Sequence, residues 1–151
     1  MGASPLTSSL KGLPVAICTM GAMVQWIAPA VYRGFFLSRA IPGMTLWEFL
    51  CTDDDPVVIK HVLTIARAAI VTMHDKGLFH ADLNLHNLMV TQSGESFKVI
   101  ILDLDKARLF DSAVKPALRA KNAARLLRSA RKLDPQGTHL DASALSILDV
   151  S

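Results

Sequence analysis

The clearest pattern in the chain is a run of apolar residues at three- and four-residue spacing between Pro56 and Gly77. The run consists of Val58, Val62, Ile65, Ala66, Ala69, Ile70 and Met73. This spacing puts the apolar side chains on one face of a helix. Asp55 before Pro56 is a typical helix start, and Gly77 is a typical stop. The pattern predicts a long amphipathic helix that packs on a core and leads directly into the polar residues 80–87.

Two shorter elements are predicted before this helix. Residues 31–41 have a strand-like sequence, which Pro42 and Gly43 end. Residues 45–50 then form a short helical candidate, with Thr45 in the capping position.

Further elements are predicted after the polar residues. Apolar runs at 88–91 and 97–102 flank a loop that contains Gly94, which predicts a β-hairpin. Residues 116–133 predict a basic helix, and residues 142–148 carry a weaker helical signal.

Residues 12–32 carry no charge and are about long enough to cross a bilayer as a helix. Pro14 and Pro29 interrupt such a helix. Strands around 15–20 and 32–37 are therefore favoured, and a transmembrane helix is the alternative.

Composition and charge narrow the class of protein. Of the 151 residues, 51% are hydrophobic and 19% are charged, which excludes a disordered or collagen-like chain and fits one domain. The net charge of +3 is uneven, because residues 115–132 are rich in lysine and arginine and contain no acid. Cys18 and Cys51 lack a metal or disulfide spacing, so free thiols in a reduced, cytosolic compartment are expected.

The polar residues 80–87 read His-Ala-Asp-Leu-Asn-Leu-His-Asn, and Asp103-Leu104-Asp105 follows the second apolar run. Phosphoryl transfer needs a carboxylate that orients the acceptor hydroxyl and oxygen ligands that hold Mg²⁺ on the phosphates. Asp82, Asn87 and Asp103 supply these groups if the predicted hairpin returns Asp103 to the loop.

The order His-x-Asp-x-x-x-x-Asn followed by a metal aspartate resembles the protein-kinase-like superfamily. Residues 80–87, Asp103-Leu104-Asp105 in place of Asp-Phe-Gly, and Asn122-x-x-Arg125-Leu126-x-Arg128-Ser129 together resemble the 3-deoxy-D-manno-octulosonic acid (Kdo) kinases. These and the related heptose kinases phosphorylate inner-core sugars of lipopolysaccharide with ATP.

The resemblance implies an α+β fold: the C-terminal lobe of a protein-kinase-like domain, mainly helical with short β-hairpins, with the N-terminal lobe largely absent. Residues 1–12 are expected to be frayed and residues 13–133 to form the kinase-like domain. Within it, residues 13–44 would be the remaining N-lobe strands and hinge, and 45–133 the C-lobe. Residues 134–151 are expected to be a tail.

Roles follow from the same resemblance. Asp82 would be the catalytic base, Asn87 and Asp103 the magnesium ligands, and His80 a support for the loop. Asn84 stands where protein kinases usually place a lysine that contacts the transferred phosphate.

Other roles are less central. The hinge residues Ser38, Arg39, Ala40 and Ile41 would contact adenine of ATP through their backbone. Asp105 is either a second metal contact or a turn residue. Arg125 and Arg128 would be structural or acceptor-side contacts.

The expected function is therefore ATP- and Mg²⁺-dependent phosphorylation of a lipid-linked Kdo or heptose sugar, on the cytoplasmic face of the inner membrane. The glycine-rich loop and strand lysine of a complete kinase are missing from the sequence, so a fragment of the enzyme is expected. A non-catalytic pseudokinase or scaffold is one alternative. An aminoglycoside- or choline-phosphotransferase-like enzyme is another.

Competing interpretations of single features stay open. The basic residues 115–132 are a solvated face, a contact with the anionic membrane, or a contact with acidic groups of the acceptor. Nucleic-acid binding is not expected, because no stacking platform accompanies the charge. His80, Asp82 and His86 would be ligands of zinc in another interpretation. His61 and His74 are expected to be exposed or capping residues.

Overall fold

The computed structural model of the protein describes residues 19–28, 31–38 and 40–151. The predicted frayed segment 1–12 lies outside these residues, as do Cys18 and Arg39.

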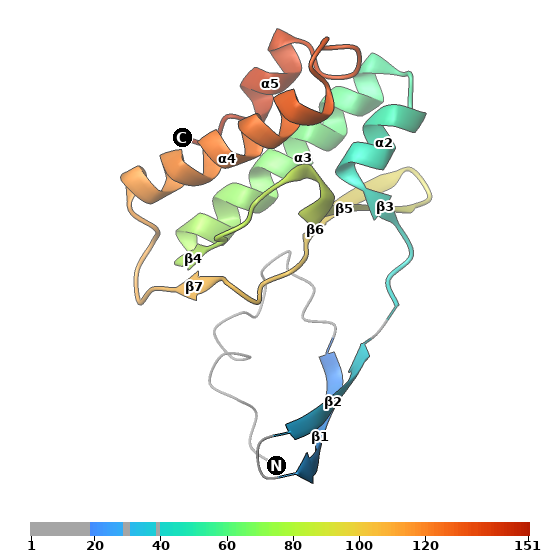
Figure 1. Ribbon diagram of the computed structural model, residues 1–151. Coiled ribbons are helices and arrows are strands. Elements are labelled where there is room, and N and C mark those ends of the chain that lie inside the picture. Colours follow the sequence, from blue (N-terminus) through green and yellow to red (C-terminus); the bar gives the residue numbers. More distant parts are fainter. Residues whose placement is uncertain (1–18, 29–30, 39) are drawn as a thin grey trace.

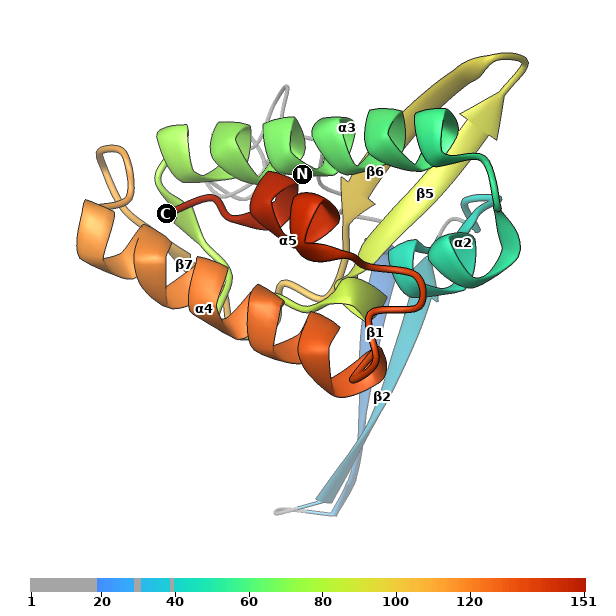
Figure 2. The same cartoon turned by 90° about the horizontal axis from the view of Figure 1, so that it is seen from above.

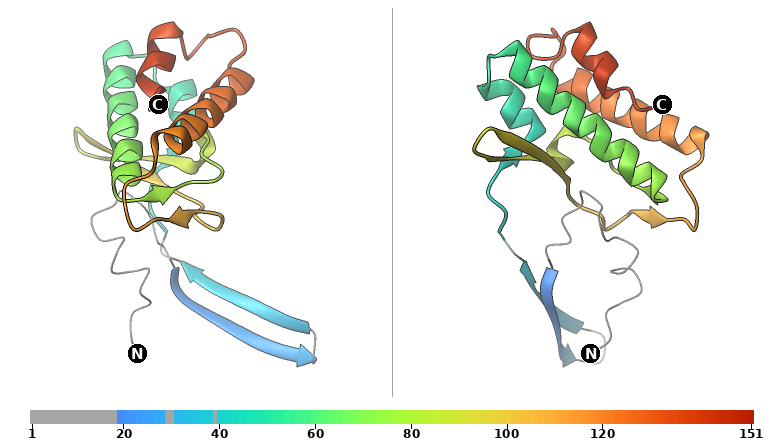
Figure 3. Two further views of the ribbon diagram at one scale, coloured as in Figure 1. Left: turned by 90° about the vertical axis from the view of Figure 1, so that its left-hand side faces the viewer. Right: turned by 180° about the vertical axis from the view of Figure 1, so that it is seen from behind.

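The N-terminal part of the described chain is a β-hairpin. Strands β1 (Thr19–Ala28) and β2 (Val31–Ser38) pair antiparallel along their length. Figures 1 and 3 show the hairpin projecting away from the helices. The alternative of a membrane-crossing helix over residues 12–32 is wrong where this range is described, because cross-strand pairing holds it extended.

The remaining elements form a helical body with short strands. In chain order they are β3 (Met44–Thr45), α2 (Leu46–Thr52), α3 (Pro56–Asp75), β4 (Leu78–Phe79), the 3-10 turn η1 (Leu85–Asn87), β5 (Leu88–Ser93), β6 (Ser96–Ile101), β7 (Arg108–Leu109), α4 (Pro116–Leu133) and α5 (Ala142–Leu148). Strands β3, β5 and β6 form one antiparallel sheet, and β4 pairs with β7. The α+β prediction is confirmed.

The predicted helix starts are confirmed by their caps. The Thr45 hydroxyl accepts from the Glu48 N–H at 3.2 Å, and the Glu48 carboxylate accepts from the Thr45 N–H at 2.8 Å. This reciprocal pair is a capping box. At α3, the Asp55 carboxylate accepts from the Val57 N–H at 2.8 Å, and Pro56 follows it in the first turn.

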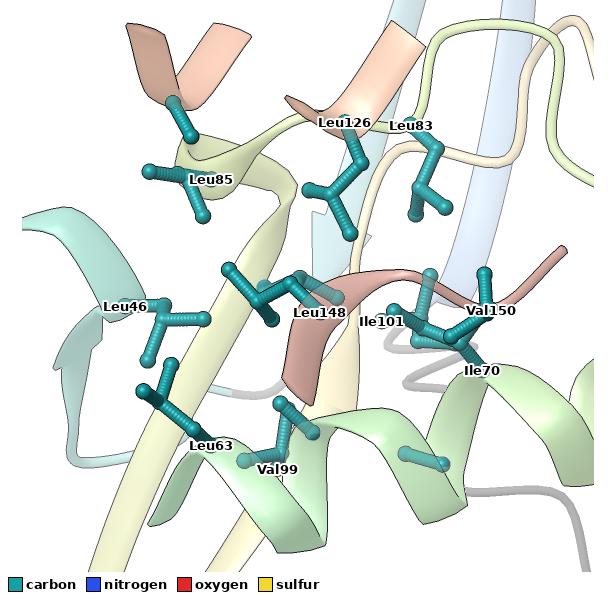
Figure 4. Packing of buried hydrophobic residues seen from close by; sticks show 14 of the residues in the cluster. Leu46, Leu63, Ile70, Leu83, Leu85, Val99, Ile101, Leu126, Leu148 and Val150 are labelled. Atoms are coloured by element: carbon teal, nitrogen blue, oxygen red, sulfur yellow. The ribbon is translucent and has the colours of Figure 1, made fainter. Parts of the chain in front are cut away.

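The core forms where α3 meets the sheet and the other helices. Leu63 and Ile70 of α3, Ile101 of β6 and Leu126 of α4 belong to one cluster of buried side chains (Figure 4). Burying each such side chain stabilises the fold by about 1.5–3 kcal/mol. Among the described helices α3 is long and apolar enough to cross a membrane, but its apolar stripe faces this core.

Residues 134–151 belong to the packed body. Figure 2 shows α5 lying between α3 and α4, and Leu140, Ala144 and Leu148 are buried in the core. The weak helical signal at 142–148 therefore corresponds to a helix, α5. The segment 134–151, expected to be a tail, contributes side chains to the core. Its few apolar residues suffice because two helices already offer it an apolar surface.

Asp134 holds the turn that directs the chain from α4 back to α5. Its carboxylate accepts hydrogen bonds from the N–H groups of Thr138, His139 and Leu140 at 2.9, 2.7 and 2.8 Å. Burial by itself would raise the pKa of Asp134, but the three donors together hold this pKa below its ordinary value.

Gly77 connects α3 to β4 in a conformation that other residues rarely adopt. Its φ is +80°, and a Cβ at this position would lie 2.4 Å from the Phe110 carbonyl oxygen and 2.7 Å from that of Ser112. The Gly77 carbonyl also accepts from the Phe110 N–H at 2.9 Å. The close approach of these two segments therefore requires glycine.

Gly77→Ala is expected to lower the free energy of unfolding more than Gly94→Ala, measured by urea denaturation. Gly94 also has a positive φ, +61°, but a Cβ there meets nothing within 4 Å. Gly94→Ala should lower the free energy of unfolding by about 1–2 kcal/mol, the cost of a left-handed backbone conformation for a residue with a Cβ. Equal losses would show that the approach of residues 110–112 does not constrain position 77.

Asp134→Asn is expected to lower the free energy of unfolding at pH 7 by about 1–3 kcal/mol, because three N–H donors, that of Leu140 buried and the other two partly buried, lose their carboxylate. The folded pKa is lowered, so the unfolded state binds the proton more readily and the Asp134 contribution is lost as pH falls below about 4. Urea midpoints at pH 7, 5 and 3 should thus show a gap between wild type and variant that closes with acid. The exposed Asp54→Asn is the control, and a gap that persists at pH 3 contradicts the prediction.

Candidate functional site

The candidate site lies where the loop after β4 meets the end of β6. The loop, residues 80–84, leads into η1, and β6 delivers Leu102 and Asp103 beside it. The Leu102 N–H donates to the Asn87 carbonyl at 2.8 Å. The hairpin of β5 and β6 therefore returns the chain to the loop, as the sequence predicts.

His80 joins the two segments through both nitrogens of its ring. Its Nδ1 accepts from the Asp82 N–H at 3.1 Å, so its Nε2 carries the proton and donates to the Leu102 carbonyl at 2.8 Å. The side chain is 1% exposed. The predicted supporting role matches these contacts, since the ring fixes the residue before Asp103 relative to Asp82.

Two asparagine side chains shape the loop from within. The Asn84 side-chain oxygen accepts from the N–H groups of His86 and Asn87 at 2.9 and 3.1 Å, which caps η1. The amide groups of Asn84 and Asn87 both donate to the Asp82 carbonyl at 3.0 Å. Asn84 thus binds the loop's own backbone on both sides, which gives it a structural role in this conformation.

The Asp82 carboxylate is half-exposed and pairs with α4. Its Oδ1 accepts from Arg125 Nη1 at 3.0 Å, and the two side chains are 54% and 42% exposed. Solvent screens a pair this exposed, so it contributes less than about 1 kcal/mol. Arg125, predicted as a structural or acceptor-side contact, thus touches the predicted base directly, and its role stays a prediction.

Asp103 adopts a backbone conformation that sets it apart. Its φ is +58°, and among the described residues it is the non-glycine residue with a positive φ. This conformation is unfavourable for most side chains, although aspartate tolerates it, and it is concentrated at functional sites. The side chain is exposed.

Buried hydrogen bonds beneath the loop connect His74, Asn122 and His80, and the sequence pattern did not predict them. Asn122 of α4 is fully buried, accepts from His74 Nε2 at 3.0 Å and donates to the His80 carbonyl at 2.6 Å. Burial lowers the pKa of His74, which keeps the ring neutral. The expectation that His74 is exposed or a cap is therefore wrong.

The helical spacing in the sequence contains a signal for these buried hydrogen bonds of His74 and Asn122. Asn122 stands four residues before the buried Leu126, and His74 stands four residues after the buried Ile70. A polar residue within an apolar stripe indicates a buried hydrogen bond.

The other predicted site residues lie apart from this network. Ser38 ends β2, and Ala40 and Ile41 lie in the connection from the hairpin to the body. Asp105 lies in an exposed turn that the bond from the Ala107 N–H to the Leu104 carbonyl closes. Arg128 is exposed on α4 and has no hydrogen-bond partner among the described residues. The adenine and metal roles of these residues stay predictions.

The chemistry of the donors at this loop fits a magnesium ion. The Asn87 amide nitrogen donates to the Asp82 carbonyl, which leaves the amide oxygen available. The exposed Asp103 carboxylate is a second oxygen group of the kind that Mg²⁺ binds together with phosphate oxygens, and the metal roles of Asn87 and Asp103 stay predictions. The zinc interpretation is wrong for His80, because both ring nitrogens are engaged.

A family model and curated relatives both relate this sequence to lipopolysaccharide sugar kinases. Residues 11–146 match the model of the "Lipopolysaccharide kinase (Kdo/WaaP) family". The chain is 42% identical over 123 residues to a 3-deoxy-D-manno-octulosonic acid kinase of Xylella fastidiosa strain 9a5c and 35% identical over 127 residues to that of strain M23. Each match covers 82% of this chain but 45% of the relative, so the chain spans a little under half the length of these curated relatives.

Solved structures show the same fold. WaaP, in a complex with acyl carrier protein, superimposes with a TM-score of 0.59 at 19% identity, covering 94% of this chain and 70% of WaaP. The Rio2 kinase of Chaetomium thermophilum superimposes with a TM-score of 0.54 at 13% identity, covering 95% of this chain and 42% of Rio2. The kinase-like fold predicted from residues 80–105 is thus confirmed. With its match over residues 11–146, the chain belongs to the lipopolysaccharide kinase (Kdo/WaaP) family.

Proposed function

We propose that this chain carries the catalytic half of a kinase that transfers the γ-phosphoryl group of ATP to a sugar hydroxyl of the lipopolysaccharide inner core. The observation that carries the proposal is the double hydrogen bond of His80, which joins the Asp82 loop to the residue before Asp103. Phosphoryl transfer depends on positioning and charge stabilisation, and this tie supports the proposal because it fixes the Asp82 backbone relative to the residue before Asp103.

Asp82 is the acceptor-side group in this proposal. Its carboxylate accepts the proton of the sugar hydroxyl and orients the oxygen toward the γ-phosphorus. The carboxylate is exposed enough for a substrate to reach it, and its backbone is fixed by hydrogen bonds at both its N–H and its carbonyl.

Asn87 and Asp103 would hold Mg²⁺ in this proposal. The bound ion would neutralise the developing charge on the phosphates. The Rio2 structure, which shares the fold, is a complex with ADP, Mg²⁺ and phosphoaspartate. The residues Ser38 to Ile41 would contact the adenine through their backbone.

The reaction is proposed to occur on the cytoplasmic face of the inner membrane. Arg128, Arg131 and Lys132 of α4 are exposed, as is Lys115 directly before the helix. Each such residue near an anionic membrane surface contributes about 1 kcal/mol to binding. The basic helix would hold the kinase near its lipid-linked acceptor.

A non-catalytic scaffold is the second candidate. Transfer assays separate the candidates. A protein that transfers phosphate to a Kdo-bearing lipid supports the kinase, one that prefers aminoglycosides or choline supports a small-molecule phosphotransferase, and one that transfers to none supports the scaffold.

Asp82→Ala, in the protein as its native host produces it, is expected to lower the rate of transfer to a Kdo-bearing lipid by about 10²–10⁴-fold. Nucleotide affinity should change little, because Asp82 is assigned to the hydroxyl and not to the phosphates. Rates come from radiolabelled phosphate transfer and affinity from nucleotide titration. Asp54→Ala, an exposed acid between α2 and α3, is the control, and retained transfer in Asp82→Ala rejects the assignment.

Asn87→Ala is expected to raise the Mg²⁺ concentration for half-maximal transfer by about tenfold to a hundredfold. This is the loss of metal affinity that is typical when a residue that supports a metal site is replaced. Asn84→Ala is the comparison variant, because it also removes one amide bond to the Asp82 carbonyl, and in addition the cap of η1, but no proposed ligand. It should lower the rate and shift the Mg²⁺ requirement less than Asn87→Ala does. Equal shifts in both variants would assign Asn87 to loop structure alone.

A further inference from the structure

Transfer of a phosphoryl group requires positive charge that residues 80–87 do not supply by themselves. In the transition state, negative charge spreads over the outer oxygens of the transferred group, and Arg, Lys or Mg²⁺ stabilises it. Residues 80–87 contain no lysine or arginine, the side chains that stay charged at neutral pH. A cationic side chain at the phosphoryl group therefore comes from another element of the fold.

Asn84 does not take this role in the structure. Its side-chain oxygen accepts from the N–H groups of His86 and Asn87, and its amide group donates to the Asp82 carbonyl at 3.0 Å. Reaching toward a phosphate would break these bonds and remove the cap of η1. The loop therefore uses this neutral side chain for its own geometry.

Arg125 of α4 brings a guanidinium group to the loop. Its Nη1 donates to Asp82 Oδ1 at 3.0 Å, and this is the one hydrogen bond that its side chain makes within the described residues. A guanidinium group has five N–H donors in a planar fork that matches phosphate oxygens. The side chain is 42% exposed, so a ligand can reach the remaining donors.

The contact with Asp82 places this guanidinium group beside the path of the reaction. In the proposed function the Asp82 carboxylate holds the acceptor hydroxyl at about 3 Å, and the γ-phosphorus lies about 3–3.5 Å from the hydroxyl oxygen. The hydroxyl and Arg125 thus bind the same carboxylate. Because the ion pair is exposed and weak, an arriving hydroxyl can release the guanidinium group toward the phosphoryl oxygens.

Neighbouring cations favour this release. A cavity of about 400 Å³ next to the loop is lined by Lys106, Arg108, Lys121 and Arg125, and no acidic residue among the described ones lines it. Like charges at close range repel each other and stabilise an anion nearby. Of the four, Arg125 forms the salt bridge with Asp82, which separates it from the other three as the candidate.

We propose that Arg125 is a catalytic residue of the phosphoryl transfer. When the acceptor hydroxyl binds Asp82, the guanidinium group turns from the carboxylate and donates to the outer oxygens of the transferred phosphoryl group. The proposal rests on the kinase function above. It gives Arg125 a role on the phosphate side, in place of the structural or acceptor-side contact expected from the sequence.

The reaction balances without a proton from Arg125. The acceptor oxygen forms a bond to the γ-phosphorus, and its proton passes to the Asp82 carboxylate. The bond from the γ-phosphorus to the bridging oxygen of ATP breaks, and its electron pair leaves with ADP. Arg125 stays protonated throughout and stabilises the charge on the outer oxygens.

The first test measures transfer to a Kdo-bearing lipid by the protein as its native host produces it. Arg125→Ala is expected to lower kcat by about 10²–10³-fold, the usual loss when one donor to developing charge is removed. The KM for the lipid should change little, whereas loss of an acceptor-side contact would raise it. Arg125→Lys should recover part of the rate, because lysine keeps the charge but not the planar fork. Guanidinium chloride at millimolar concentration should restore part of the rate of Arg125→Ala.

Arg119→Ala is the matched control. Arg119 also belongs to α4 and pairs with an acid, Asp75, at 2.7 Å. Its replacement should lower the free energy of unfolding and leave kcat unchanged at a temperature where the variant is folded.

A second measurement separates contact with the phosphoryl group from an indirect effect through Asp82. ADP with aluminium fluoride mimics the transferred group, and calorimetry gives its affinity relative to that of ADP alone. Arg125→Ala should lower this gain in affinity about tenfold or more, the effect of a lost hydrogen bond between charged groups. The same loss should appear when Arg125→Ala is combined with Asp82→Asn.

Three results would each overturn the role of Arg125. They are a wild-type kcat in Arg125→Ala, a raised KM for the lipid with an unchanged kcat, and a loss of aluminium fluoride affinity that disappears in the Asp82→Asn background. None of them touches the proposed function, which stands while wild type transfers phosphate and Asp82→Ala does not. A wild type that transfers to no acceptor would remove both the function and this role.

Discussion

The site depends on one imidazole ring that bonds in two directions. His80 accepts from the Asp82 N–H and donates to the Leu102 carbonyl, and it is almost fully buried. Removing either bond would leave a buried polar group unsatisfied, which costs about 1–3 kcal/mol. The ring thus makes the predicted base and the residue before Asp103 parts of one rigid unit, although 20 residues separate them.

A second layer of hydrogen bonds supports this ring from below. Asn122 donates to the His80 carbonyl and accepts from His74, so α3 and α4 both hold the loop. Nδ1 of His74 has no partner within the part of the chain that the structure describes. Because burial keeps this ring neutral, that atom is an unpaired acceptor and not a buried charge. The helices that form the core are therefore the same helices that position the site.

Beside the catalytic loop, the Asp82 carboxylate is exposed to solvent and lies near several basic side chains. Among the described residues the Asp82 carboxylate pairs with one half-exposed arginine, Arg125. The neighbouring cavity of about 400 Å³ is lined by Arg125 and three further cations, Lys106, Arg108 and Lys121. A weak, solvent-screened pair can exchange for a ligand at little cost. The hydrogen-bonded loop and the exposed ion pair thus differ: the first fixes the geometry of the backbone, and the second can exchange its partner.

By itself, the sequence determined the helices at 56–75 and 116–133 and the hairpin that starts at Leu88, because spacing and caps are local properties. It also predicted that the polar residues 80–87 carry the chemistry. Only the tertiary structure decided that residues 134–151 pack in the core and that His74 is buried, since both depend on surfaces supplied by distant segments. The contact of Arg125 with Asp82 and the basic cavity were decided in the same way. They join residues from α4, β7 and the loop after β4, and no local pattern in the sequence encodes which of seven basic residues will meet there.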